Sequence, residues 1–194
     1  EMNRNIDRIF TNFAVALLLI FTATAANAVD MSGHIGGFFG GKKLKSDDWP
    51  DIDTHYSMGV IFDIQKDSWP ISIVLDITDT GGKHKHDGVE DLGHTTEYHL
   101  GIRKVFERDS DLQPYIGGGV ALMYAEQELA TIGTTTTQDD RGVGGWVGAG
   151  MYYEINPGFV LGLDVRYSHG EVNLFDKDRN AGGIHAGITG GYQF

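Results

Sequence analysis

FVLGLDVRY, residues 159–167, alternates between large apolar side chains and mostly small or charged ones. On an extended chain one face would hold Phe159, Leu161, Leu163, Val165 and Tyr167, and the other Val160, Gly162, Asp164 and Arg166. Successive side chains of a β-strand point to opposite faces of the sheet, so this pattern predicts a strand with one apolar face. Residues 56–64 and 71–77 repeat it.

Further along the chain the alternation defines eight segments, near residues 31–42, 55–65, 70–79, 94–106, 112–125, 143–155, 159–169 and 182–194. Each is at least about as long as the 9–11 residues that a tilted membrane strand needs. Short connections at 66–69, 107–111 and 156–158 alternate with long polar ones at 43–54, 80–93, 126–142 and 170–181. Membrane barrels combine short turns at one end with long loops at the other. We therefore predict an all-β fold, an eight-stranded antiparallel up-and-down transmembrane β-barrel.

A water-soluble barrel or sandwich would show the same alternation with its apolar face turned inward. Three features favour the opposite orientation. The face opposite the apolar stripe is rich in glycine and charge, aromatic side chains gather near the strand ends, and the last strand ends on an aromatic residue, Phe194. We expect the apolar face to meet lipid.

The polar face then lines the lumen, where isolated charges are too costly to bury. The expected charge network consists of Asp63, Asp76, Glu97, His99, Arg103, Glu154, Asp164, Arg166 and His185. Arg103 and Arg166 are expected to pair with some of these carboxylates, with the histidines completing the network. Because eight strands leave a lumen just wide enough for side chains, we expect Tyr115, Trp146 and Tyr152 to fill it.

The N-terminus carries Arg4 and Arg8, then the apolar run FAVALLLIFTATAA at residues 13–26, then Ala26-Asn27-Ala28. A basic start, a short apolar run and a small-x-small site predict a secretory signal peptide over residues 1–28, with the barrel domain over 29–194. An N-terminal membrane anchor is the alternative, although the apolar run is short for a span.

Composition narrows the remaining classes. The chain has 194 residues, no cysteine and a formal charge of −12, which excludes a disulfide framework and argues against nucleic acid as a partner. Its 28 glycines are about twice the usual frequency, and there are few prolines. Glycine in strands allows tight curvature and leaves room for neighbouring side chains.

Several stretches resemble a known family. The C-terminal segment IHAGITGGYQF, residues 184–194, resembles the insertion signal of outer-membrane proteins, with Ile188, Tyr192 and Phe194 as its expected residues. Together with QPYIGGG at 113–119, GWVGAGMYY at 145–153 and GLDVRYS at 162–168, it gives the mature chain a resemblance to the OmpA/OmpX/OmpW-like small outer-membrane barrels. The resemblance implies a cell outer membrane location in a Gram-negative-type bacterium, lipids and lipopolysaccharide as surroundings, insertion by the barrel-assembly machinery and a monomer.

Two stretches raise the question of site chemistry. His84, His86 and His94 lie among carboxylates in one long connection, but interleaved lysines and the absence of a repeated ligand spacing argue for a solvated loop rather than a metal site. His169 resembles in part the H-x-S-N motif of the lipid A deacylases, but Glu171 stands where the serine should be, which leaves no nucleophile. We expect neither cofactor nor catalysis.

The expected function is a non-catalytic surface barrel whose acidic outer loops contact an unknown external ligand. This expectation rests on the fold, and folds do not determine functions. One alternative is a narrow channel or transporter for small or hydrophobic solutes, as in the OmpW-type barrels, and another is a lipid A-modifying enzyme.

Overall fold

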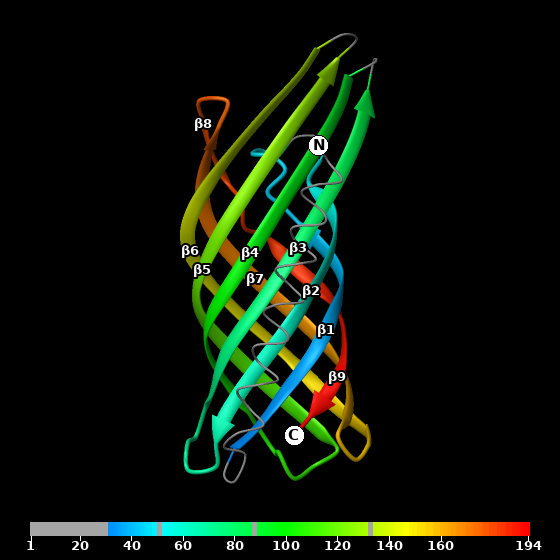
Figure 1. Cartoon of the computed structure of the whole chain (residues 1–194), viewed down its shortest axis with the longest axis vertical. Helices are drawn as coiled ribbons and strands as arrows, with labels where there is room; N and C mark the ends of the chain where they lie inside the picture. Colours follow the sequence, from blue (N-terminus) through cyan, green and yellow to red (C-terminus); the bar gives the residue numbers. More distant parts are fainter. Residues whose placement is uncertain (1–30, 50–51, 87–88, 132–133) are drawn as a thin grey trace. The chain divides into compact units, whose positions relative to one another are not determined.

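The computed structural model describes residues 31–49, 52–86, 89–131 and 134–194, which form antiparallel β-strands and their connections (Figure 1). The strands are β1 (Met31–Lys43), β2 (Thr54–Lys66), β3 (Ser72–His86), β4 (Val89–Val105), β5 (Leu112–Thr131), β6 (Thr134–Asn156), β7 (Phe159–Leu174), β8 (Lys177–Asn180) and β9 (Ile184–Gln193). The predicted signal peptide, residues 1–28, lies outside the described residues. The described residues include no helix of the length and apolarity that crossing a membrane requires.

The sheet closes on itself. Each strand from β1 to β7 pairs antiparallel with the next, and β9 pairs with both β7 and β1. The wall therefore has eight strands, as predicted, because β8 pairs only with residues Glu171–Leu174 of β7. Closure leaves no open sheet edge along the described wall, which a hydrocarbon environment demands of a spanning sheet.

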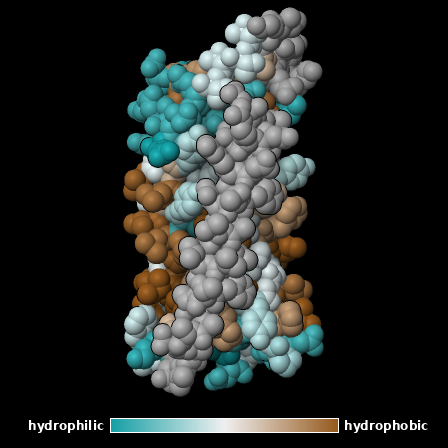
Figure 2. All heavy atoms as spheres, viewed as in Figure 1, coloured by the Kyte–Doolittle hydropathy of each residue, from teal (hydrophilic) through white to brown (hydrophobic). Residues whose placement is uncertain are grey.

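The apolar face of the sheet points outward, which confirms the expected orientation. Leu163 is 53% exposed whereas its neighbours Asp164 and Arg166 are each 2% exposed. In Figure 2 the hydrophobic residues form a belt between two hydrophilic ends. Aromatic side chains border the belt at the end with the short turns: Trp69, Phe106, Tyr153, Phe159 and Tyr192. We call this end the inner end and the opposite one the outer end.

Two connections predicted as long loops are strands instead. Residues 80–93 and 126–142 continue the β3–β4 and β5–β6 ladders without a register shift, almost to their tips. Beyond Ile77, Tyr98, Leu122 and Val143 the outward side chains are mostly polar, with Leu92 as an apolar exception. The described residues of 79–96 and 124–141 therefore form a four-stranded extension, which we call the outer sheet (Figure 1). The error arose because strands in water need no apolar stripe, and β-branched residues such as Thr134–Thr137 favour strands.

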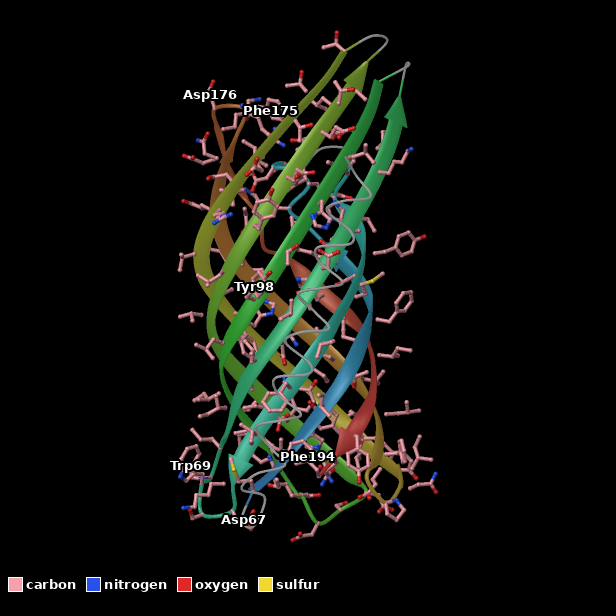
Figure 3. All side chains as sticks on the ribbon, viewed as in Figure 1. Asp67, Trp69, Tyr98, Phe175, Asp176 and Phe194 are labelled. Atoms are coloured by element: carbon pink, nitrogen blue, oxygen red, sulfur yellow. The ribbon has the colours of Figure 1, made fainter. Side chains whose placement is uncertain are left out.

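A tight turn joins β7 to β8 at the outer end, where Figure 3 shows Phe175 and Asp176. Both residues have positive φ, at 54° and 57°. Two successive residues with positive φ form the type of turn whose twist matches a hairpin, although glycine and asparagine are the usual occupants. The fourth predicted loop, 170–181, is thus largely a hairpin as well.

Candidate functional site

The centre of the lumen holds a chain of ion pairs between neighbouring and facing strands. Arg103 on β4 contacts Asp63 at 3.0 Å and Asp76 at 2.9 Å. Arg166 on β7 contacts the same Asp76 at 2.9 Å and Asp164 at 3.4 Å. All of these side chains are buried, and each arginine has two carboxylate partners.

A second group lies nearer the outer end, around the buried Glu97. Its carboxylate contacts Lys42 at 2.6 Å, and the rings of His99 and His185 at 2.9 Å each. The two groups are joined, because a guanidinium nitrogen of Arg166 donates to Nδ1 of His99 at 2.8 Å. The structure therefore brings together eight of the nine residues expected in the lumen network.

Glu154 is the exception. Its carboxylate accepts a hydrogen bond from the backbone N–H of Gly158 at 3.0 Å, in the β6–β7 turn. The strand is irregular here, between Glu154 and Asn156, and the side chain serves the turn at the inner rim. Assigning Glu154 to the charge network was wrong. The alternation of side chains shows which residues face the lumen, but not how far along the barrel axis each one lies.

Two residues of the network were missed. Lys42 supplies a third buried base, and it also donates to the Thr95 hydroxyl at 2.7 Å. His34 places one ring nitrogen 3.2 Å from Asp63 and the other 3.2 Å from the Gln193 side-chain oxygen. An oxygen atom thus lies within hydrogen-bond distance of each nitrogen of this ring. Both residues occupy inward-facing positions in the alternation of the first predicted strand, and that alternation was the signal that could have identified them.

Aromatic and apolar side chains occupy the rest of the lumen. Tyr115 donates to Asp164 at 2.5 Å, and Tyr152 accepts from Arg103 at 2.8 Å. Trp146 lies under the guanidinium of Arg166, at 5.2 Å. All three aromatic residues are buried, as expected for a filled lumen.

Both ends of the lumen are covered. At the outer end the β1–β2 connection turns its buried Trp49 inward, and the Trp49 indole donates to the carbonyl of Asn180 at 2.8 Å. At the inner end Arg108, from the β4–β5 turn, donates to Ser32 at 3.3 Å and to Ser72 at 2.7 Å. A solute would have to displace these side chains and the ion pairs between them.

An ion pair and hydrogen bonds to Asp53 stabilise the β1–β2 connection. Lys43 contacts Asp53 at 2.6 Å, and Ser46 donates to the same carboxylate at 2.5 Å. Hydrogen bonds from Lys43, Ser46 and Thr54 lower the pKa of Asp53 to about 2. The carboxylate of Asp53 therefore stays charged in acid, and the β1–β2 connection over the lumen keeps these contacts.

The outer sheet carries an uneven distribution of charge. Glu126 and Asp139 lie directly opposite each other on β5 and β6, and Glu128 lies two residues beyond Glu126. Like charges placed opposite each other on a sheet are destabilising. In the sequence each of the segments 43–54, 80–93, 126–142 and 170–181 holds more acidic than basic residues.

The histidines weighed as metal ligands do not converge. His94 contacts Asp79 at 2.8 Å on the outward face, whereas His84 falls on the opposite face of the outer sheet. The side chain of His86 lies outside the described ones. Among the residues that the structure describes, no three histidine, aspartate or glutamate side chains gather as a metal site would require.

The residues compared with a deacylase also separate. Ser168 is buried in the lumen, where its hydroxyl accepts from the Gly183 N–H at 3.3 Å, and His169 is exposed on the outward face. The two side chains cannot act on one substrate.

The residues of the expected insertion signal lie on one face of the last strand. Ile188, Tyr192 and Phe194 are all exposed outward on or just after β9, and Figure 3 shows Phe194 at the inner end, the end at which Trp69 also lies. Their recognition during insertion stays a prediction.

Comparison with known proteins agrees with this architecture. The family model described as outer membrane protein beta-barrel domain matches residues 13–194. Among curated proteins, no sequence matches. Ail, the attachment invasion locus protein of Yersinia pestis, solved with the heparin analogue sucrose octasulfate, is similar in fold with a TM-score of 0.60 at 13% identity, over 86% of this chain and 100% of that one.

Two further solved structures are similar. OprG of Pseudomonas aeruginosa has a TM-score of 0.57 at 16% identity, over 85% of this chain and 96% of that one. A major outer membrane protein of Thermus thermophilus has a TM-score of 0.55 at 10% identity, over 85% and 98%. At such identities the likeness concerns the fold alone.

Proposed function

Because the chain belongs to the outer membrane protein β-barrel family, we propose that it is a non-catalytic surface barrel that keeps its lumen closed and contacts the cell's exterior through its outer sheet. The observation that carries the proposal is the contrast between the two parts. Ion pairs and aromatic rings fill the lumen, while four strands continue past the apolar belt with polar side chains.

The charge of the outer sheet supports a cationic partner. Ail was solved with a heparin analogue, which is a sulfated and strongly anionic ligand. Glu126, Glu128 and Asp139 would repel such a ligand, and Glu126 lies directly opposite Asp139. A cationic protein surface would relieve that repulsion, so we expect the partner to carry a positive charge, opposite to that of heparin.

The first test is conductance. The purified protein in a planar lipid bilayer should show no ionic current above that of the protein-free membrane, because ion pairs and aromatic rings occupy the lumen. A steady conductance, or uptake of small hydrophobic solutes into vesicles containing the protein, would support the narrow transporter instead. Formation of a modified lipid A by the protein, lost in His169→Ala, would support an enzyme.

The second test is surface binding. Cells displaying the protein are measured for adhesion to poly-lysine-coated and heparin-coated beads. The variant E126Q/E128Q/D139N should bind poly-lysine less than the unaltered protein does, whereas D109N/D111N, in an inner turn, serves as the matched control. Equal binding by both variants, or preference for heparin, would contradict the proposed surface.

The remaining expectations become part of this proposal. Lipids and lipopolysaccharide would surround the apolar belt, the barrel-assembly machinery would read the last strand, and the barrel would act as a monomer. Each is open to direct measurement in native membranes.

A further inference from the structure

The outward face of the barrel has a groove with a glycine floor. It crosses from β4 to β7, has a volume of about 1120 Å³, and is bordered by Ile102, Ile116, Val147 and Tyr167. That volume exceeds the roughly 300–1000 Å³ of an ordinary small-molecule site. Gly118 and Gly145 form its floor, and a Cβ at Gly145 would come no nearer than 3.5 Å to its first neighbour, the Gly119 carbonyl oxygen.

The groove runs from the inner part of the apolar belt toward its outer border. Near one end Lys104 pairs with Ile116, and near the other Gly145 pairs with His169. On β5 the first pair lies at Ile116 and the second lies beside Val120, which pairs with Gly145. These two positions are four residues apart, which is about 14 Å along the strand. That length is close to one leaflet of bilayer hydrocarbon, whose full core is about 30 Å thick.

The inner end of the groove contains a cation. Lys104 is half-buried, and in the described part of the chain no carboxylate or hydrogen-bond acceptor contacts its ammonium group. It lies two residues closer to the middle of the belt than Phe106, the aromatic residue at the inner border. A charge at this depth is unfavourable unless an anion meets it, and lysine is a common partner of phosphate.

The outer end has the opposite character. Glu171 borders the groove there, next to His169. An anionic head group would be repelled at Glu171 and attracted at Lys104, so the phosphate of a lipid belongs at the inner end.

We propose that this groove holds one phospholipid of the inner leaflet, with its phosphate on Lys104 and an acyl chain lying over Gly118 and Gly145. The occupant follows from the surroundings. Apart from its outer end at Glu171, the groove lies within the apolar belt of an outer-membrane barrel, where hydrocarbon chains are the solvent, and the positive charge at its inner end selects an anionic head group. Side chains at the two glycines would occupy the path of the chain.

The test compares lipid retention by native mass spectrometry. Delipidated protein receives palmitoyl-oleoyl phosphatidylglycerol and is then released from detergent, and bound lipid is counted. The unaltered protein should keep one phosphatidylglycerol. K104Q should lower its occupancy about tenfold, the effect of removing one charge-assisted contact, and G145L should lower it similarly by filling the groove.

Matched controls separate this site from general adhesion of lipid. Lys66 is an exposed lysine at the inner end of β2, and K66Q should retain lipid as the unaltered protein does. Gly37 faces outward on β1, where a Cβ would meet only the Gly59 carbonyl oxygen, at 4.0 Å, and G37L should behave likewise. If G145L does not fold by circular dichroism, V147F fills the same groove.

Further ligands distinguish the sources of the phosphate. Glycerol phosphate, which lacks acyl chains, should not be retained, and uncharged diacylglycerol should be retained less than phosphatidylglycerol. Equal retention by K104Q, G145L and the unaltered protein would overturn the proposal. So would equal losses in K66Q and G37L, or retention of glycerol phosphate at the same level.

Discussion

Among single residues, Arg103 connects several partners in the lumen. It contacts Asp63 and Asp76 at once and also donates to Tyr152. Asp76 is in turn shared with Arg166, so two guanidinium groups and three carboxylates form one connected set with Asp164. Buried ion pairs of this kind contribute little net stability when intact, but the loss of one member leaves a charge without compensation.

Arg103→Met should therefore destabilise the barrel strongly. Two buried carboxylates would lose a partner, and removal of one member of a buried pair costs about 3–5 kcal/mol. Urea titration of the protein in lipid vesicles, followed by tryptophan fluorescence, measures the change. Arg108→Met is the graded control, because Arg108 is more exposed and lies 3.9 Å from Asp63. An equal cost for both variants would contradict the role given to the ion pairs.

Leu163→Arg probes the outward face in the same way. Leu163 is exposed within the apolar belt, and an arginine near the bilayer midplane costs about 2–4 kcal/mol. Glu171→Arg, on the same face of β7 but beyond the belt, should change the free energy of unfolding little. The same urea titration measures both, and a larger effect at Glu171 would mean that the belt is misplaced.

At the scale of elements, the outer sheet differs from the wall in how it is held. Its strands continue the wall's hydrogen-bond ladder, but its side chains meet water on the outward face. Local ion pairs such as His94 with Asp79 therefore replace lipid contact and lumen packing there.

The His94–Asp79 contact should make the outer sheet sensitive to pH. Burial opposes the charged ring, but the carboxylates of Asp79 and Glu126 outweigh it and raise the pKa of His94 above its ordinary 6.5. A raised pKa in the folded state means that the contact stabilises fully below pH 6.5 and is lost as pH rises through the folded value. Hydrogen exchange of the β3–β4 amides should quicken over that range, and Asp79→Asn should remove the pH dependence. Unchanged exchange across it would refute the assignment.

At the scale of the whole molecule, different interactions stabilise the closed wall and the outer sheet. The wall closes through β1–β9 and β7–β9, and the ion pairs that fill it lie within the belt. The outer sheet contributes no strand to that closure in the described part of the chain. The side chains that the outer sheet presents to the exterior can therefore change while the wall of the barrel stays the same.

Replacing residues 84–91 and 128–137 by two-residue turns should leave the barrel folded. We expect a change in the free energy of unfolding of no more than about 1 kcal/mol, the range of surface changes away from the core. Binding of poly-lysine beads should fall, as the outer sheet would be shortened. Failure of the shortened protein to insert into vesicles would show that wall and outer sheet fold as one unit.

Much of this architecture follows from local alternation along the chain. The stretch at 159–167 alternates with a period of two, and that period alone sets which side chains share a face. Three short turns, at 66–69, 107–111 and 156–158, together with four longer polar connections then divided the wall into eight strands. A residue's face is a local property, because pleating depends only on neighbours in the chain.

Partners across the lumen depend on the tertiary structure. Lys42 meets Glu97 because closure brings β1 opposite β4, whereas His34 meets Asp63 on the adjacent strand β2. Glu154 has the parity of a lumen residue but serves a turn, since depth depends on the tilt and stagger of the strands. The alternation of side chains thus determined the faces and the number of wall strands from sequence, whereas closure of the barrel decided which charges meet and where the strands end.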